Sequence, residues 1–203
     1  MPSVYDIKPR FQALLRPMVR RMAAAGISAN QVTVAAMLVS VAVGVAVGVC
    51  AGGRPWLFGL LPLWLFLRMA LNAVDGMLAR EHGQASKLGA VLNELGDVVA
   101  DAGLYLPLAL TPVFSLWPLA VFVLLAVLTE MTGVVGVQIG ASRRYDGPMG
   151  KSDRALLFGA LGLALAVGAP PGAWIDWLVW VLAALCALTV LNRARAALRE
   201  VRA

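Results

Sequence analysis

The sequence contains few charged residues, one histidine and two cysteines. Only 14% of its 203 residues are Asp, Glu, Lys or Arg, and 61% are hydrophobic, whereas about a quarter of a soluble domain is charged. This scarcity of charge argues against a soluble domain. Cys50 and Cys186 lie far apart in apolar segments, so neither a disulfide framework nor a cysteine metal site can be read from them. His82, in a polar loop, favours capping or headgroup contact over catalysis.

Long apolar runs fill most of the chain, and its mean hydropathy is +0.82. Backbone groups in hydrocarbon must be satisfied within a segment or a closed barrel, and unalternating Leu, Val and Ala indicate helices. We therefore predict an all-α integral membrane protein. It would form one domain over 1–203, with an interfacial amphipathic helix at 1–27, a six-helix core at 31–191 and a cytoplasmic tail at 192–203. Spanning needs about 20 apolar residues, and the expected spans are 31–51, 56–79, 88–110, 115–140, 154–169 and 173–191.

Basic residues gather on one side of the six predicted spans. This side carries Lys8, Arg10, Arg16, Arg20, Arg21, Arg80, Lys87, Arg143, Arg144, Lys151, Arg154, Arg193, Arg195, Arg199 and Arg202, and the opposite loops carry only Arg54. By the positive-inside rule the basic side, with both termini, is cytoplasmic. The net charge of +6 is therefore interpreted as orientation and lipid contact, not nucleic-acid binding. The Ala- and Arg-rich composition suggests a bacterial inner membrane.

The segment before the first span has the pattern of a helix lying in the membrane interface. Phe11, Leu14, Leu15, Met18 and Met22 recur at helical spacing, with basic residues on other faces. Such a helix buries its apolar face at the headgroup boundary. It has two possible roles, a basic anchor for topology or a cover for an active site.

Polar residues interrupt the second and third predicted spans. Arg68, Asn72, Asp75 and Ala79 follow helical spacing on one, and Gly89, Asn93, Asp97 and Asp101 follow it on the other. Charged residues inside spans are costly and functional by default. Because the connecting loop is short, the two helices should form an antiparallel hairpin whose polar stripes face each other near the cytoplasmic end. The resulting oxygen-rich pocket suits Mg²⁺ or Mn²⁺.

Two further carboxylates lie in apolar surroundings. Glu94 is expected to pair with Arg68 or with another span. Glu130 is expected to pair with Arg68 or a polar group of the cavity, or to be protonated and structural.

The hairpin resembles the CDP-alcohol phosphatidyltransferase family, whose motif is D-x2-D-G-x2-A-R-x8-G-x3-D-x3-D. This chain reads N-x2-D-G-x2-A-R-x8-G-x3-N-x3-D from Asn72 to Asp97. The resemblance implies a six-helix fold around a cytoplasmic polar cavity, often as a homodimer. It also implies transfer of a phosphatidyl group from a CDP-linked lipid such as CDP-diacylglycerol to an alcohol or phosphorylated alcohol, with release of CMP and help from Mg²⁺ or Mn²⁺.

The family roles transfer to the matching positions of this sequence. Asp75 would be a metal ligand that also faces the nucleotide, and Asp97 would be both a metal ligand and the general base. The remaining nucleotide-binding positions are Gly76, Ala79, Arg80 and Gly89.

Two positions depart from the motif, because Asn72 and Asn93 replace its first and third Asp. The formal charge of the four positions falls from minus four to minus two, so a site for two divalent ions would hold one, or hold metal more weakly. Asp101, one turn beyond Asp97, is the better candidate for a substitute ligand, and Glu94 is the other.

A basic loop between the fourth and fifth spans supplies candidates for acceptor binding. These are Arg143, Arg144, Lys151 and Arg154, whose charge suits phosphate oxygens. The alternative is that they only set topology.

Two rival functions stay open. One is an altered or non-catalytic relative that binds a nucleotide lipid. The other is an ion or proton transporter using Asp75, Asp97, Asp101 and Glu130. Release of CMP separates transfer from both, and the sequence leaves the acceptor alcohol open.

Overall fold

The computed structural model describes residues 4–202. Within them the chain forms α-helices and short 3-10 turns and contains no strand. The elements are α1 (Val4–Ala24), α2 (Ala29–Cys50), η1 (Ala51–Gly53), η2 (Pro55–Gly59), α3 (Leu60–Glu81), α4 (Lys87–Tyr105), η3 (Leu106–Leu110), α5 (Leu116–Gln138), α6 (Lys151–Ala166) and α7 (Ala173–Arg202). The predicted all-helical architecture is confirmed.

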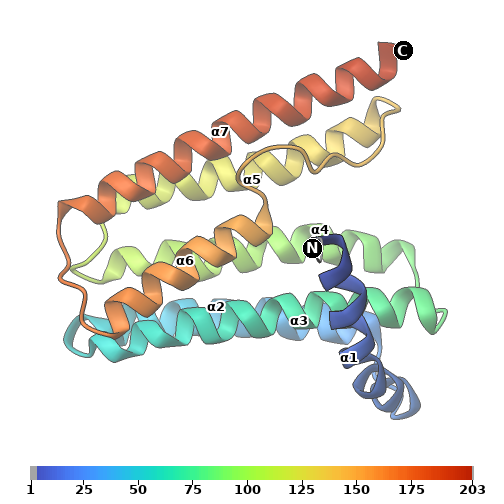
Figure 1. The fold of residues 1–203 in the computed structure, drawn as a ribbon, viewed down its shortest axis with the longest axis horizontal. Coiled ribbons are helices and arrows are strands. Elements are labelled where there is room, and N and C mark those ends of the chain that lie inside the picture. Colours follow the sequence, from blue (N-terminus) through green and yellow to red (C-terminus); the bar gives the residue numbers. More distant parts are fainter. Residues whose placement is uncertain (1–3, 203) are drawn as a thin grey trace.

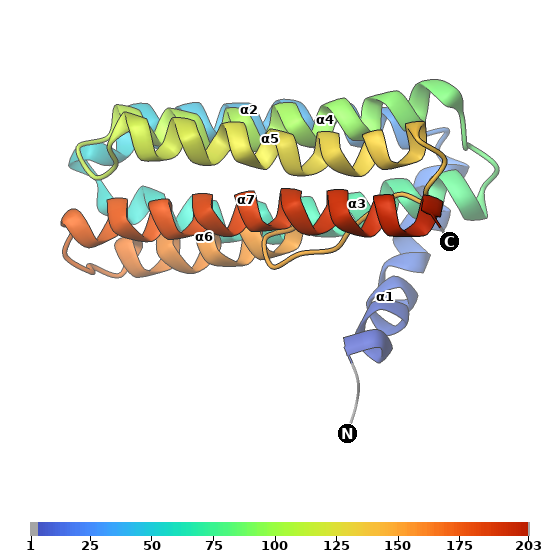
Figure 2. The same ribbon diagram turned by 90° about the horizontal axis from the view of Figure 1, so that it is seen from above.

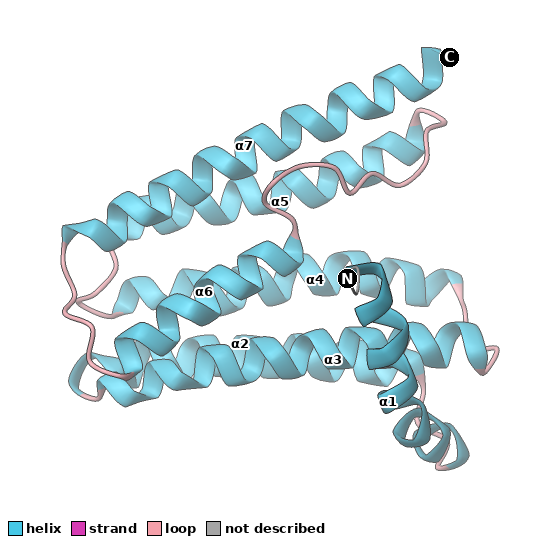
Figure 3. Cartoon of the chain, viewed as in Figure 1, coloured by secondary structure: helices cyan, strands magenta, loops and turns pink. Residues whose placement is uncertain are grey.

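The six helices from α2 to α7 run side by side in two layers. Helices α2, α4 and α5 form one layer and α3, α6 and α7 the other (Figures 1 and 2). Short turns join most consecutive helices, and a longer loop at 139–150 joins α5 to α6 (Figure 3). The main apolar core lies between the layers, where Leu104, Phe122, Phe158 and Val179 are fully buried. Many apolar side chains instead face outwards, as expected for helices solvated by lipid.

Four helical segments of the described chain are long and apolar enough to cross a membrane. They are Ala29–Gly53, Pro55–Glu81, Leu116–Gln138 and Ala173–Arg202. Helix α6 has only 16 residues, and α4 carries three carboxylates along its length. An integral membrane protein is therefore supported, whereas six spans stay a prediction.

The observed boundaries differ from the predicted ones by a few residues at several helices, and two differences matter for the site. The third predicted span, 88–110, ends as an α-helix at Tyr105 and continues as η3, whose second residue is Pro107. The predicted tail, 192–203, is a continuation of α7 through Arg202. Arg193 on this continuation is buried, so the end of α7 belongs to the folded core.

Helices α2 and α4 approach each other closely because glycines face each other. A methyl group on Gly44 would overlap the backbone of Gly103, and one on Gly48 would overlap Pro107. Small residues allow such backbone contact between membrane helices. The helix that carries Asp97 is thereby fixed against α2.

Helix α1 lies across the end of the bundle, beside α3 (Figures 1 and 2). Val19 is fully buried against a small cluster that includes Met77 of α3, whereas Leu14 is 75% exposed. Arg16 pairs with Glu81 through two hydrogen bonds of 3.0 Å. One apolar edge of α1 thus packs on the bundle and another faces outwards, an arrangement consistent with an interfacial helix.

Candidate functional site

Helices α3 and α4 form the predicted antiparallel hairpin around a loop at 82–86. Ser86 starts α4 by accepting a hydrogen bond of 2.9 Å from the Gly89 amide. Gly83 adopts a positive φ of 66°, a conformation that glycine takes without steric cost. The loop therefore returns the chain so that the two motif stripes face one cavity.

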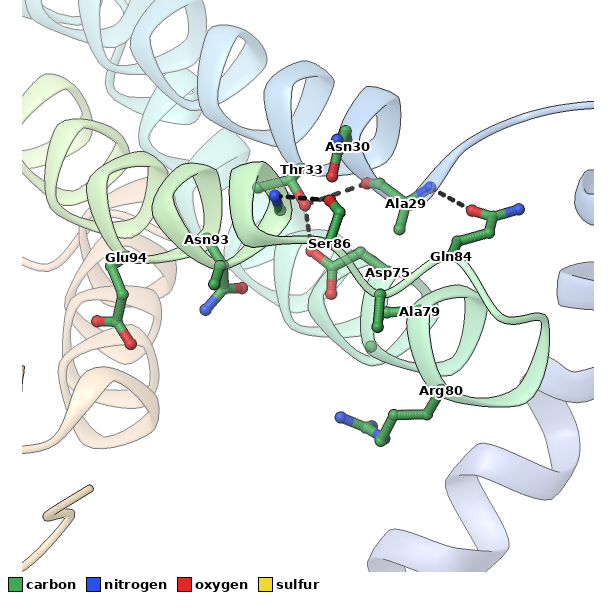
Figure 4. A pocket seen from close by; sticks show the side chains of 14 residues that line it. Ala29, Asn30, Thr33, Asp75, Ala79, Arg80, Gln84, Ser86, Asn93 and Glu94 are labelled. Atoms are coloured by element: carbon green, nitrogen blue, oxygen red, sulfur yellow. Dashed lines mark hydrogen bonds between the residues drawn. The ribbon is translucent and has the colours of Figure 1, made fainter. Parts of the chain in front are cut away.

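The first pocket is a cavity of about 340 Å³ at this end of the hairpin (Figure 4). Asp75, Gly76, Ala79 and Arg80 of α3 line one side, and Gly89, Asn93 and Glu94 of α4 line the other. The structure thus gathers every predicted nucleotide-binding residue. The start of α2 closes the pocket with Asn30 and Thr33, which the motif does not include.

Asp75 is oriented by α2. Its Oδ2 accepts a hydrogen bond of 2.8 Å from the Thr33 hydroxyl, and the residue is only 6% exposed. The Thr33 hydroxyl also approaches the Ala29 carbonyl oxygen at 3.1 Å. A buried carboxylate needs such partners, so Thr33 fixes the direction in which Asp75 faces the pocket.

Arg80 reaches over the glycine one turn before it. A methyl group on Gly76 would lie 2.8 Å from one terminal nitrogen of Arg80, so the absence of a side chain at Gly76 makes room for the guanidinium. Among the described side chains, residues 11–202, Arg80 forms no ion pair. Its donors are therefore available for an anion in the first pocket.

Gln84 ties the hairpin loop to α2. Its Oε1 accepts a hydrogen bond of 2.7 Å from the Ala29 amide, and its Nε2 donates to the Ile27 carbonyl at 3.3 Å. Both bonds involve the backbone just before or at the start of α2. Gln84 thereby holds the wall that carries Asn30 and Thr33.

The second pocket, also about 340 Å³, lies on the other side of Asn93 and Glu94. Its lining comes from α4, α5, α6, α7 and the loop at 139–150, and comprises Asn93, Glu94, Asp97, Glu130, Arg143, Tyr145, Gly150, Lys151, Ser152, Asp153 and Arg193. The first and second pockets share only Asn93 and Glu94. One turn of α4 is thus the common wall of two polar cavities.

Asp97 faces the second pocket between two cations. Its Oδ2 accepts a hydrogen bond of 2.6 Å from Lys151 Nζ, and its Oδ1 lies 3.4 Å from Nη2 of Arg68. The backbone carbonyl of Asp97 also accepts from Arg68, at 3.2 Å. Both oxygens of this carboxylate are held in place by the protein.

Asp101 lies deeper in the bundle and is held by two guanidinium groups. Oδ1 accepts from Arg68 and Oδ2 accepts from Arg154 at 2.9 Å. Neither pocket includes Asp101 among its lining residues. We expected it to supply a substitute metal ligand, but the geometry instead points to a role in positioning Arg68, and through it Asp97.

Glu130 joins three arginines from different parts of the chain. It accepts from Arg154 at 3.0 Å and from Arg143 at 3.2 Å, and it lies 3.4 Å from Arg193. Of the two partners expected for Glu130, Arg68 is not one, because it binds Asp97 and Asp101, whereas Arg143 and Arg193 are polar groups of the cavity. Glu130 is the point at which α6, α7 and the loop at 139–150 meet α5.

The four basic residues predicted to bind an acceptor occupy different environments. Arg143 and Lys151 line the second pocket. Arg154 is 1% exposed and donates to Asp101, Glu130 and Thr129. Arg144 lines neither pocket and pairs with Asp146 and Glu200.

Arg143 binds the common wall from the loop side. Its guanidinium donates to Glu94 at 2.7 and 3.1 Å, so Glu94 pairs with a loop residue and not, as we expected, with Arg68 or another span. The guanidinium fits against α5 only because residue 133 is glycine, since a methyl group there would overlap it. Gly133 therefore accommodates Arg143, whereas Gly159 and Gly162 pack against α3 and η2.

Residues 26–191 match the family described as CDP-alcohol phosphatidyltransferase. The chain belongs to the CDP-alcohol phosphatidyltransferase family. Members of this family are membrane transferases of phospholipid biosynthesis. Its motif is the hairpin that lines the first pocket and ends at Asp97 in the second.

A similar curated protein and two similar solved structures support the assignment. Inner membrane protein YnbA of Escherichia coli (strain K12) is 44% identical over 196 residues, which cover 97% of this chain and 96% of YnbA. The phosphatidylinositol phosphate synthase PgsA1 of Mycobacterium tuberculosis shares the fold at 19% identity. With CDP-DAG bound it gives a TM-score of 0.72 over 91% of this chain and 92% of that one. In complex with manganese and citrate it gives a TM-score of 0.73 over 90% of this chain and 88% of that one.

The oxygen ligands of this CDP-alcohol phosphatidyltransferase fit one hard cation in their chemistry. Asp75 offers a carboxylate from the first pocket, Asp97 another from the second, and Asn93 an amide in both. Asn72, which was also predicted as a ligand, lines neither pocket. Among the described residues no group of three or more His, Cys, Asp or Glu side chains is arranged to hold a metal ion. The remaining ligands of a cation would therefore come from phosphate oxygens or water, as Mg²⁺ prefers.

Sequence reasoning missed several residues of the two pockets. Asn30, Thr33 and Gln84 shape the first pocket, and Arg193 lines the second. Asn30 and Thr33 lie outside the motif on a helix without charged residues, so no pattern in the sequence singled them out as pocket residues. Arg193 lies just beyond a predicted span and was counted as topology-setting charge. Only the continuation of α7 brings it back to Glu130.

Proposed function

We propose that this protein transfers a phosphatidyl or similar substituted phosphate group from a CDP-linked lipid, such as CDP-diacylglycerol, to an acceptor alcohol and releases CMP. The observation that supports this is the pair of polar pockets separated by one turn of α4. A transferase needs two sites whose reacting atoms meet, and a common wall places them side by side.

The first pocket would bind the cytidine diphosphate. Gly76, Ala79 and Gly89 have small side chains or none, so the nucleotide can approach the backbone of the helices closely. Arg80 carries no ion pair among the described side chains and would donate to the pyrophosphate. Asp75, oriented by Thr33, would face the same group through a divalent cation.

Asp97 would act as the general base. The acceptor hydroxyl oxygen would form a bond to the phosphorus that carries the lipid, and the bond from this phosphorus to the bridging oxygen of the pyrophosphate would break. CMP leaves with that oxygen, and the hydroxyl proton passes to the Asp97 carboxylate. Lys151 and Arg68 hold the carboxylate in place at the second pocket.

Asp75 and the Asn93 amide are the residues that would hold Mg²⁺ or Mn²⁺, while Asp97, paired with Lys151, would serve as the base. Such a cation, when bound, supplies positive charge to the phosphate oxygens as charge develops on them. Asn72 could contribute only if its side chain moved towards the pocket, because it lines neither cavity.

The second pocket would bind the acceptor. Two guanidinium groups, those of Arg143 and Arg193, line it beside carboxylates, and contact of these groups with phosphate oxygens would favour a phosphorylated alcohol over a neutral one. Arg144 and Arg154 would support this pocket from outside, through Asp146 and through Glu130.

The membrane arrangement forms part of the proposal. All six helices of the bundle would cross a bacterial inner membrane, with the two pockets and both termini on the cytoplasmic side. The basic loops support this orientation, and the inner-membrane name of the Escherichia coli relative agrees with the location. A homodimer is expected from the family resemblance.

Release of CMP by the purified protein in lipid micelles tests the function. The assay would contain CDP-diacylglycerol, Mg²⁺ or Mn²⁺ and a panel of alcohols and phosphorylated alcohols. We expect metal-dependent release with a phosphorylated acceptor, and its loss in Asp97→Asn. Asp176→Asn, the same change at the opposite end of the bundle beside Ser115, should retain activity. No release with any acceptor would refute the proposal.

A second candidate function is binding of a nucleotide lipid without transfer. The two Asn replacements favour it, together with the pairing of Asp97 with Lys151. Tight CDP binding without CMP release would support this function. Ion flux in sealed vesicles without CMP release would instead indicate a transporter.

A further inference from the structure

Lys151 is the first residue of α6 and lies next to the proposed base. Its Nζ is 2.6 Å from Oδ2 of Asp97, and its side chain is 30% exposed towards the second pocket. Arg68 approaches the other oxygen, Oδ1, at 3.4 Å, but this guanidinium is shared with Asp101. Lys151 is therefore the cation that Asp97 does not share with another described carboxylate.

The position of Nζ matters for cation binding at Asp97. A divalent ion bound by a carboxylate oxygen lies about 2.0 to 2.6 Å from it. The Lys151 ammonium nitrogen, 2.6 Å from Oδ2, lies at that same distance from the oxygen. The two cations cannot both sit there, because like charges at such a separation repel strongly in a partly buried site.

The charges at the motif agree with this exclusion. Asp75 and Asp97 contribute minus two, while Asn72 and Asn93 contribute none. A single divalent ion already matches this charge, and Lys151 adds one more positive charge. Beside Lys151 and before the pyrophosphate binds, two divalent ions would leave a net charge of plus three at these positions, whereas one divalent ion would leave plus one.

We propose that the Lys151 ammonium is a fixed protein cation in the place of a second divalent ion, so that the chain binds one divalent ion, at Asp75. This inference rests on the proposed function and assigns Lys151 to the cation site, not to recognition of the acceptor. Asn72, Asn93 and Lys151 are then parts of one change. The motif lacks two carboxylates at these Asn positions because the Lys151 side chain replaces one of the two divalent ions.

The number of bound Mn²⁺ ions tests this directly. The purified protein in detergent micelles would be titrated with Mn²⁺ in the presence of CDP, with free Mn²⁺ measured by electron paramagnetic resonance. We expect one ion per chain for the wild type. The variant N72D/N93D should still bind one ion tightly, and N72D/N93D/K151M should bind two. The second ion should bind at least about tenfold more tightly in the triple variant than in the double variant.

Two further variants control for folding and for general charge effects. N72D/N93D/K151R keeps a cation beside Asp97 and should behave like N72D/N93D. N72D/N93D/K87M removes the exposed Lys87, which lines neither pocket, and should also bind one ion. Size-exclusion elution and thermal unfolding would identify any variant that is not folded.

Two outcomes would overturn the inference. One is two tight Mn²⁺ ions in the wild type, and the other is a second ion that binds N72D/N93D equally well with and without Lys151. Because the titration needs no turnover, its result is separate from the CMP assay. A wild type that binds one ion but releases no CMP refutes the proposed function alone, and one that releases CMP but binds two ions refutes the inference alone.

Discussion

The first and second pockets are equal in size but opposite in how their charges are arranged. In the first, Arg80 forms no ion pair among the described side chains, and Asp75 binds only a neutral hydroxyl. In the second, Asp97, Glu130 and Arg143 are all bound to opposite charges. The first pocket has charges ready for a ligand, and the second has charges already neutralised by each other.

This difference separates binding from stability. Removing an unpaired charge from a pocket should weaken ligand binding. It should leave the folding free energy unchanged, because no other group of the protein pairs with that charge. Removing one partner of a buried ion pair leaves an uncompensated charge and costs about 3 to 5 kcal/mol of folding free energy. Mutations in the two pockets should therefore affect different measurements.

The largest effect is expected from Arg154→Met. This change leaves Asp101 and Glu130 without their common partner, and it should lower the thermal unfolding midpoint in detergent by about 10 °C. The triple variant R154M/D101N/E130Q, which removes the orphaned charges, should recover part of the loss. A midpoint for Arg154→Met within about 2 °C of the wild type would show that the buried network does not stabilise the bundle.

A smaller effect is expected from Gly133→Ala. The added methyl group would overlap the Arg143 guanidinium and lie 2.9 Å from the Arg144 carbonyl oxygen, so the loop must shift, at a cost of about 1 to 3 kcal/mol. We expect a higher KM for the acceptor and little change in CDP affinity. Gly136→Ala is the matched control, since its methyl group would meet nothing closer than 3.3 Å. Equal effects of the two changes would argue against a special role for Gly133.

Arg80→Met should affect nucleotide binding alone. Loss of a charged hydrogen bond to phosphate weakens binding by about 1.5 to 3 kcal/mol, or about 10- to 100-fold in the Kd for CDP. The unfolding midpoint should not change, because Arg80 forms no ion pair among the described side chains. Arg195→Met, a comparable exposed change on α7, should leave the Kd unchanged. Calorimetric titration would measure the Kd for CDP of both variants. A lower unfolding midpoint with an unchanged Kd in Arg80→Met would contradict the comparison between the pockets.

The smallest effect concerns pH and the loop at 139–150. The Arg144 side chain donates to Asp146 at 2.9 and 3.0 Å and lowers the pKa of that carboxyl group. A group whose pKa falls on folding adds stability above its unfolded pKa, and this contribution disappears as the pH falls through the folded value. The unfolding midpoint should therefore fall slightly between about pH 5 and pH 3, and Asp146→Asn should reduce that slope. An unchanged slope would mean that the pair adds nothing to stability.

The first pocket was largely predictable from the sequence, because its residues lie in two short stripes on consecutive helices. Helical spacing places Asp75 and Ala79 on one face of α3, and a short loop returns α4 beside it. The same local logic located Asp97. Hydropathy likewise predicted the helices, since each bundle helix is dominated by apolar residues.

The second pocket was not predictable in the same way, because its residues come from four helices and a loop. Whether Glu130 would meet Arg68 or Arg193 depends on how α5 and α7 pack, and no local pattern specifies that packing. The same reason explains Asp101, whose spacing matched the stripe of metal ligands but whose depth in the bundle brought it to Arg154. Spacing along a helix gives the face of a residue and not the identity of its partner.

The contact between Gly44 and Gly103 bears on how such enzymes diversify. A larger residue at either position would push α4 away from α2 and move Asn93 of α4 away from Thr33 of α2 in the first pocket. Selection for the chemistry would thus preserve two glycines that touch no substrate. The loop at 139–150 has no such restraint from α2. Under the proposed function, new acceptors could arise by changes there while the first pocket is inherited intact.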